Sequence, residues 1–200
     1  ELLELKPARV YLPLELFETL DSLPEFSGEY CAALPRVWRD GDETYFSGLL
    51  DKAMSMDVSA AAVGNLGHLP LLRDKGLSLY GDFGLNVFNG RTLQYLADKG
   101  LRSATLSFEL RGAQIRDMPK VLPTEAIVYG RLPLMLTENC LIRNGAGCSC
   151  TRPYALTDRT GAAFPLLPAW GHRTEVQNSY FFGDEPPAEF TRGLFDRGVE

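Results

Sequence analysis

The sequence lacks an apolar run long enough to cross a bilayer, which takes about 20 predominantly apolar residues in a helix. Its opening segment, ELLELKPARV, is rich in charge and does not resemble the apolar core of a secretory leader. We therefore expect no membrane partner and a cytoplasmic location. Because the sequence does not begin with Met, we interpret it as part of a longer parent chain.

The sequence also lacks an excess of positive charge, because 26 acidic residues outnumber 20 Lys and Arg and give a net charge of −6. This balance excludes a basic surface that covers the whole protein, as nucleic-acid-binding domains often have. The balance does not exclude a local basic patch, since arginines recur at Arg102, Arg111, Arg116 and Arg131. Solvated helix faces account for most residues of this kind.

Cysteine and histidine are scarce, with four and two residues respectively. Four unevenly spaced cysteines do not resemble the disulfide framework of a small secreted domain, which favours a reducing compartment. Neither histidine has an evident nucleophile beside it in the sequence, so a serine or cysteine triad is poorly supported. The sequence contains no Walker loop, dinucleotide glycine fingerprint, HExxH motif or GxSxG motif.

What the sequence does contain is a repeated order of short apolar run, polar loop and amphipathic segment. Nearly continuous apolar runs bounded by Gly, Pro or Asp are typical of strands buried on both faces. The segments 42–56 and 90–100 predict helices, and Lys99-Gly100 predicts the end of the second. The expected strands are ARVYLPL (8–14), YCAALPRVW (30–38), SAAAVGN (59–65), LSLYGDF (77–83), SATLSFEL (103–110) and EAIVYGRLPLM (125–135).

This alternation predicts an α/β fold with parallel strands and right-handed crossovers. We expect residues 1–136 to form a partial TIM-barrel-like (β/α) repeat that lacks its opening strands, with an open doubly wound sheet as the alternative. Residues 137–183 are expected to form a cysteine loop and a small β-hairpin-containing extension, which ends in a strand at RTEVQNSYFF (173–182). The tail, 184–200, reads as a loop followed by a short helix.

Polar residues follow the expected strands at their carboxyl ends, the edge at which parallel α/β folds bind ligands. Glu109 comes soon after an apolar strand, where a carboxylate can act as a general base or a substrate anchor. The competing interpretation of Glu109 is a capping or first-turn acid of a helix at RGAQIRDM (111–118). The predicted site residues at this edge are Arg36, Asp82, Asn86, Glu109 and Arg131, with Asn65 and Ser107 beside them.

Three of the four cysteines, Cys140, Cys148 and Cys150, lie close together in a glycine-rich segment. Their spacing does not match a zinc finger, but three thiolates on a glycine-rich loop suit a metal ion or an iron–sulfur cluster. His172 is the candidate fourth ligand, and Cys31 is the reserve. The alternative is three free thiols, or a disulfide formed on oxidation.

Five segments together resemble the collagenase-like peptidase family U32. They stand in the family's order and cover most of the chain from about Leu34 onward. No single segment is decisive, and the resemblance rests on all five in register. The segments are GDFGLNVFN (81–89), SATLSFEL (103–110), VYGRLPLMLTENC (128–140), LTDRTGAAFP (156–165) and EVQNS (175–179).

The resemblance implies a TIM-barrel-like α/β domain, of which this chain would be the C-terminal portion. Some members of the family are described as collagen-degrading peptidases of unassigned catalytic type. Others act in oxygen-independent hydroxylation of RNA bases or of a quinone precursor and hold a four-iron, four-sulfur (4Fe–4S) cluster on four cysteines. The glutamate of SFEL and the arginine of YGRLP carry over as Glu109 and Arg131.

The cysteine motif of the family begins at TENC, so Cys140 carries over, and Cys148 and Cys150 follow it. The family's last cysteine is expected in or after LLPAWGHRTE (166–175), where this sequence has none. Either His172 replaces it, or the cluster is incomplete or absent, and zinc is the other candidate metal.

Three functions are therefore weighed. The first is an iron–sulfur-dependent, oxygen-independent hydroxylase-type role on RNA or another aromatic substrate. The second is proteolysis of a peptide substrate, with Cys148 or Cys150 and His172 as nucleophile and base. The third is a non-catalytic module with a structural zinc or thiol loop.

Overall fold

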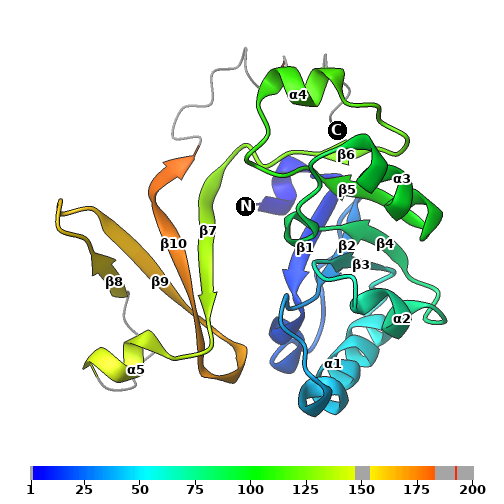
Figure 1. The fold of residues 1–200 in the computed structure, drawn as a ribbon. Helices are drawn as coiled ribbons and strands as arrows, with labels where there is room; N and C mark the ends of the chain where they lie inside the picture. Colours follow the sequence, from blue (N-terminus) through cyan, green and yellow to red (C-terminus); the bar gives the residue numbers. More distant parts are fainter. Residues whose placement is uncertain (1, 147–153, 183–191, 193–200) are drawn as a thin grey trace. The chain divides into compact units, whose positions relative to one another are not determined.

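The computed structural model describes residues 2–146, 154–182 and 192, which form two compact units. The first unit holds the described residues up to Ile127, and the second holds those from Val128. Figure 1 shows a curled parallel sheet with helices in the first unit and a separate antiparallel sheet in the second. This architecture confirms the predicted α/β class. No helix in the described ranges is both long and apolar enough to span a bilayer.

The first unit is built on a six-stranded half-barrel sheet. The strands lie side by side in their order along the chain, and each is parallel to its neighbours. All six strands fall within or beside the runs predicted from the sequence. The strands are β1 (Arg9–Pro13), β2 (Glu29–Ala33), β3 (Ala60–Val63), β4 (Ser78–Gly81), β5 (Leu101–Thr105) and β6 (Thr124–Glu125).

Helices and 3₁₀ turns form the connections between these strands. α1 (Glu43–Ser55) buries Phe46, Leu49, Leu50 and Ala53, whose spacing puts them on one face of the helix. α3 (Gly90–Asp98) begins at Asn89, whose Oδ1 accepts hydrogen bonds from two backbone N–H groups of the first turn at 3.0 Å. The shorter elements are η1 (Leu2–Leu5), η2 (Leu14–Glu18), η3 (Asp40–Asp42), α2 (His68–Leu72), η4 (Phe83–Leu85) and α4 (Gly112–Asp117).

Glycines end two of the helical segments, as the sequence predicts. Gly76 and Gly100 have φ angles of +71° and +87°, in the left-handed region that other residues rarely adopt. Each turns the chain directly into the next strand, β4 or β5. The tripeptide Asp-Lys-Gly, which occurs at 74–76 and again at 98–100, is therefore a helix-to-strand connection in both places.

The second unit is a four-stranded antiparallel sheet in the order β7-β10-β9-β8. β8 (Tyr154–Thr157) and β9 (Ala163–Ala169) form the predicted hairpin, and β10 (Arg173–Phe182) is the predicted last strand. The hairpin turn is held by Asp158, whose Oδ1 accepts hydrogen bonds from the N–H groups of Thr160 and Ala162 at 2.8 and 3.0 Å. β7 (Gly130–Thr137), α5 (Leu141–Ala146) and η5 (Trp170–His172) complete the unit.

One predicted strand, EAIVYGRLPLM, is wrong as a single parallel strand. Its first residue belongs to β6, and the part from Gly130 onward forms β7 in the antiparallel sheet. Gly130 has a φ of +116°, which redirects the chain, and every residue of β7 is exposed or half-buried instead of buried. The cysteine segment therefore follows an antiparallel strand and not the last parallel one.

Some expectations lie outside the described residues. These are the positions of Cys148 and Cys150 and the short helix expected in the tail from residue 184.

Candidate functional site

The carboxyl-terminal edge of the parallel sheet brings together four of the predicted site residues. The loop after β2 carries Arg36, the loop after β4 carries Asp82 and Asn86, and the loop after β5 carries Glu109. Parallel strands place all of these loops at one edge of the sheet, where α/β folds bind their ligands. We call this edge the rim.

Two glycines let Arg36 and Asp82 approach each other. A Cβ built on Gly64 would lie 3.3 Å from Cγ of Arg36 and 3.5 Å from Oδ2 of Asp82. A Cβ on Gly84 would meet the Gly64 carbonyl oxygen at 2.6 Å, a distance that real side chains do not reach. The loop after β3, which holds Gly64, and the loop after β4, which holds Gly84, are thus in close backbone contact. Any larger residue at position 84 would force these two loops apart.

Aromatic rings lie next to the guanidinium at the rim. The Arg36 Cζ atom is 5.2 Å from the centroid of the Phe83 ring, and the Phe83 and Phe108 centroids are 6.3 Å apart. Phe108 is 40 % exposed although it is a large apolar side chain. The exposed Phe108 ring, next to half-buried Phe83 and a cation, forms a surface on which a flat π-system can stack.

Glu109 is exposed and does not cap a helix. α4 begins after Arg111, whose N–H donates to Oε1 of Gln114 at 2.9 Å, so the first turn is completed without Glu109. The Glu109 carboxylate has no hydrogen bond or ion pair with any residue in the described ranges, and its own N–H donates to the Ser107 hydroxyl at 3.4 Å. The capping interpretation is therefore wrong, and the carboxylate faces solvent beside Phe108.

Asp82 and Asn86 have identifiable roles in the backbone of the same loop. Asp82 Oδ1 accepts a hydrogen bond from the Phe83 N–H at 2.7 Å and so begins η4. Asn86 ends η4 in the left-handed region with a φ of 48°, a conformation that asparagine tolerates better than most residues. Both residues shape the loop that carries Phe83, and their roles toward a ligand stay predictions.

Arg131 belongs to the second unit. Its Nη1 atom donates to the carbonyl oxygens of Asn178 and Ser179 at 2.9 and 2.5 Å, where the pairing of β7 with β10 is irregular. Its guanidinium also lies 5.6 Å from the Phe181 ring centroid. Within the second unit, Arg131 therefore stabilises an irregular stretch of the sheet.

Cys140 directly precedes α5 in the second unit. Its Sγ atom accepts a hydrogen bond from the Arg143 N–H at 3.3 Å, and its side chain is buried with Ile142, Leu166 and Val176. Its role as a metal ligand stays a prediction. The described residues contain no group of three or more His, Cys, Asp or Glu side chains that could hold a metal ion, and Cys148 and Cys150 lie outside them.

The two candidates for a fourth ligand differ in their surroundings. His172 is exposed at the turn before β10, near the point where the Leu141 N–H donates to the Thr174 hydroxyl at 3.0 Å. Cys31 is fully buried in β2 of the other unit, and burial raises the pKa of its thiol well above the ordinary range. A thiol of this kind is protonated at neutral pH, which disfavours Cys31 as a ligand.

The sequence did not predict a polar layer on the inner face of the half-barrel. Arg9 of β1 forms ion pairs with Glu29 of β2 at 2.9 Å and with Glu125 of β6 at 3.0 Å. Glu125 also accepts hydrogen bonds from the hydroxyls of Tyr11 at 2.7 Å and Ser103 at 2.6 Å. Because β1 and β6 are the two edges of the sheet, these contacts span its concave side.

Small residues surround this polar layer. Cys31, Ala60 and Ala62 pack with Tyr80, whose ring centroid lies 3.3 Å from Cζ of Arg9. The interior of a TIM barrel is normally filled by branched apolar residues, so a charged layer beside alanines is unusual. The signal in the sequence was a charge at or near the start of three apolar runs, at Arg9, Glu29 and Glu125.

Comparison with protein families assigns the chain to a family. The model of the family described as Peptidase family U32 matches residues 15–182. No curated protein and no solved structure matches the chain. Since the family match covers most of the sequence, the chain belongs to peptidase family U32.

Proposed function

We propose that this chain binds an aromatic ring at the rim and takes part in its oxygen-independent hydroxylation, with an unpaired RNA base as the substrate. The observation that carries the proposal is the exposed Phe108 ring beside Phe83 and the Arg36 guanidinium. Stacking on aromatic and guanidinium planes is the main way in which proteins hold unpaired bases.

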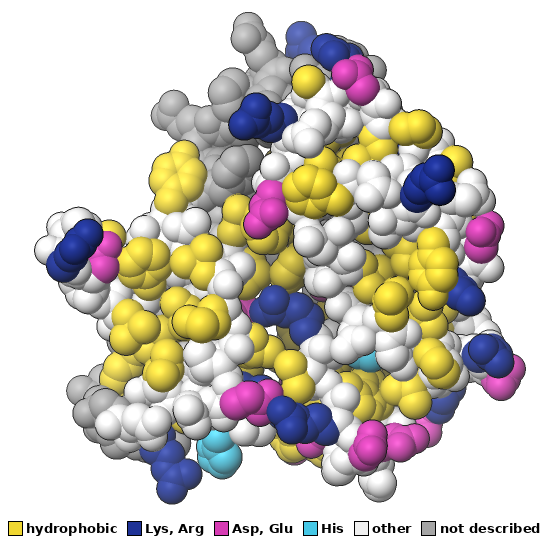
Figure 2. Space-filling view, in the orientation of Figure 1, with side chains coloured by type: hydrophobic (Ala, Val, Ile, Leu, Met, Phe, Trp, Pro, Cys, Tyr) yellow, Lys and Arg dark blue, Asp and Glu magenta, His cyan; other side chains and the backbone are white. Residues whose placement is uncertain are grey.

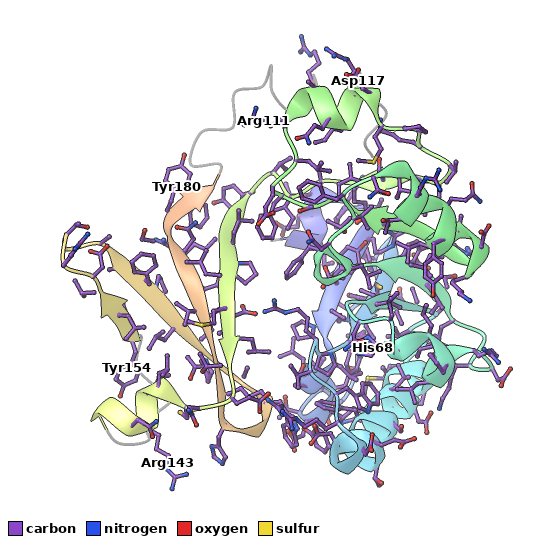
Figure 3. All side chains as sticks on the ribbon, viewed as in Figure 1. His68, Arg111, Asp117, Arg143, Tyr154 and Tyr180 are labelled. Carbon is purple, nitrogen blue, oxygen red and sulfur yellow. The ribbon has the colours of Figure 1, made fainter. Side chains whose placement is uncertain are left out.

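The charge of the protein limits how RNA would be held. On the face shown in Figure 2, Lys and Arg side chains are scattered among Asp and Glu and do not form one basic field. Contacts to phosphates would therefore be few and local, and Arg111 at the start of α4 is placed for one (Figure 3). Such a site selects an exposed base in a loop or at an end and not a long duplex.

Redox chemistry would be supplied by an iron–sulfur cluster on the thiols of Cys140, Cys148 and Cys150, with His172 as the fourth ligand. The side chain of Glu109 would hold or accept a proton at the substrate, since its carboxylate is exposed beside Phe108. Converting an aromatic C–H bond to C–OH removes two electrons from the ring, so the oxygen atom must come from a second, oxygen-carrying substrate other than O₂ that leaves the site reduced by two electrons.

Proteolysis finds less support in the described residues. No hydrogen bond within the described ranges joins either histidine to a serine, threonine or cysteine side chain. His68 is buried, and burial lowers its pKa to about 4, while His172 is exposed. A peptidase needs an activated nucleophile or a metal-bound water, and neither is assembled in this part of the chain.

Replacing Phe108 by leucine tests the stacking surface. We expect the dissociation constant for a single-stranded RNA oligonucleotide to rise at least about fivefold, because losing one stacked base costs about 1–3 kcal/mol. Fluorescence anisotropy at fixed salt measures this constant. Tyr95→Leu is the matched control, since Tyr95 is 46 % exposed on α3, and we expect it to leave the constant unchanged within about twofold.

Equal losses in the two variants would contradict stacking at the rim. If wild-type protein does not bind the oligonucleotide but benzoate protects Phe108 from solvent, the substrate is a small aromatic acid and the RNA assignment fails.

A further inference from the structure

A pocket of about 230 Å³ lies at the same edge of the sheet, between the loop after β2 and the start of α2. Trp38 and His68 form part of its wall, and Asp40 and Glu43 lie beside them. Asn65 separates this pocket from the rim, because its Nδ2 donates to the Arg36 carbonyl and its Oδ1 accepts from the Gly67 N–H. The pocket therefore has its own lining, next to the proposed substrate site.

Three buried polar atoms of this lining have no hydrogen-bond partner in the part of the chain that the structure describes. They are Nε1 of Trp38 and both ring nitrogens of His68. His68 is 1 % exposed, and its ring centroid lies 5.7 Å from that of Trp38 (Figure 3). Buried polar groups in folded proteins nearly always have a partner, so three orphans in one pocket indicate a missing one.

The charge state of the imidazole defines what that partner must offer. Burial lowers the pKa of His68 to about 4, and the Pro35 carbonyl, which approaches the ring outside hydrogen-bond geometry, opposes this shift only in part. The ring is thus neutral at pH 7, with one N–H donor and one acceptor nitrogen. Together with the indole N–H of Trp38, the inner end of the pocket offers two donors and one acceptor.

The outer end of the pocket has a net negative charge, because the carboxylates of Asp40 and Glu43 outnumber the guanidinium of Arg39. The carboxylates of Asp40 and Glu43 are exposed there, and neither has an ion pair with any residue in the described ranges. A ligand that satisfies both ends has an oxygen that accepts hydrogen bonds at the inner end and a positive charge at the outer end. The volume limits it to a few heavy atoms, because one water occupies about 30 Å³ of liquid.

We propose that this pocket binds a small ammonium compound with an oxygen acceptor, whose oxygen receives the Trp38 and His68 N–H groups and whose ammonium lies between Asp40 and Glu43. The ligand is distinct from the aromatic substrate of the rim. Its site does not depend on the proposed function or on any metal. Occupancy would hold the loop after β2, which carries Arg36, against the start of α2.

Glycinamide is the probe, since it joins an ammonium group to a carbonyl oxygen. We expect a saturable shift of the Trp38 indole N–H resonance in ¹H–¹⁵N spectra of the ¹⁵N-labelled protein, with a dissociation constant of about 1–10 mM for so small a ligand. The indole of Trp170, in the second unit, is the internal reference and should not shift. Acetamide and ethylamine, which each carry one half of the probe, should bind at least fivefold more weakly.

Two variants make the assignment specific. Trp38→Phe keeps an aromatic ring but removes the indole N–H that reports binding, so binding in this variant is followed at the backbone N–H resonance of Gly67, which also lines the pocket. Glycinamide binding should weaken at least fivefold. Trp170→Phe makes the same chemical change outside the pocket and should leave binding unchanged. His68→Phe should abolish the saturable shift.

A different pattern would overturn the proposal. If ordered water alone satisfies the three atoms, glycinamide gives no saturable shift at tens of millimolar. Equal weakening by Trp38→Phe and Trp170→Phe would likewise remove the pocket as the site.

Discussion

Replacing Glu125 by alanine is expected to lower the free energy of unfolding by about 3 kcal/mol, because it leaves the Arg9 guanidinium without one of its two partners on the concave face. Glu125 accepts hydrogen bonds from three side chains, and its own side chain is only 23 % exposed. Burial of Tyr11 raises the pKa of its phenol, and the hydrogen bond to Glu125 adds to this rise, whereas the Arg9 guanidinium opposes it. The phenol therefore stays protonated and donates to Glu125 at neutral pH.

Urea unfolding followed by circular dichroism measures this loss. The matched control is Asp51→Asn, which removes the ion pair of Asp51 with Lys75 on the surface. Asp51 is 62 % exposed, so we expect that change to cost no more than about 0.5 kcal/mol. Similar losses in the two variants would show that the concave layer does not hold β1 and β6 together.

Replacing Glu109 by glutamine is expected to lower turnover by about 10²- to 10⁴-fold without unfolding the protein, because an amide cannot take up a proton as a carboxylate does. The side chain is exposed and makes no contact within the described ranges that the fold needs. The change in the free energy of unfolding should therefore stay within about 0.5 kcal/mol.

Turnover is measured as the gain of one oxygen atom in nucleosides of RNA from anaerobically grown cells that express either protein. Glu25→Gln is the control for a charge change on an exposed carboxylate outside the rim, in the loop before β2, and it should retain full turnover. Loss of the fold in Glu109→Gln, or unchanged turnover, would contradict the role given to Glu109.

The elements that the sequence predicted correctly are those with a strong local signal. β3 is buried along its whole length and reads as a continuous apolar run, and Asn89 and Gly100 delimit α3. The hairpin at Asp158 is likewise encoded by residues that contact one another within a single turn. Such features need no knowledge of the rest of the chain.

The features that the sequence did not predict depend on residues far apart in the chain. Arg9 and Glu125 are 116 positions apart, so their pairing follows from the curl of the sheet and not from any local pattern. A charge at the start of a strand reads as the boundary of an apolar run, although here it faces the interior. The division of EAIVYGRLPLM between two sheets was missed for a similar reason, since Gly130 alone redirects the chain.

The rim was predicted from the sequence in part. The carboxyl ends of parallel strands predicted that Arg36, Asp82 and Glu109 belong to one edge, and the fold places them there. The sequence did not predict the roles of Phe83 and Phe108, which lie next to the charged residues Asp82 and Glu109. The signal available in the sequence was a phenylalanine just after each apolar strand, beside a carboxylate.

The iron content of anaerobically purified protein tests the central claim most directly. The account predicts a brown protein with about four irons and matching acid-labile sulfide per chain after reconstitution, and the loss of both in Cys140→Ser. Cys31→Ser is the matched thiol control and should keep the iron, because Cys31 lies in the core of the other unit. A colourless protein that binds zinc stoichiometrically, or one that binds no metal at all, would contradict the account.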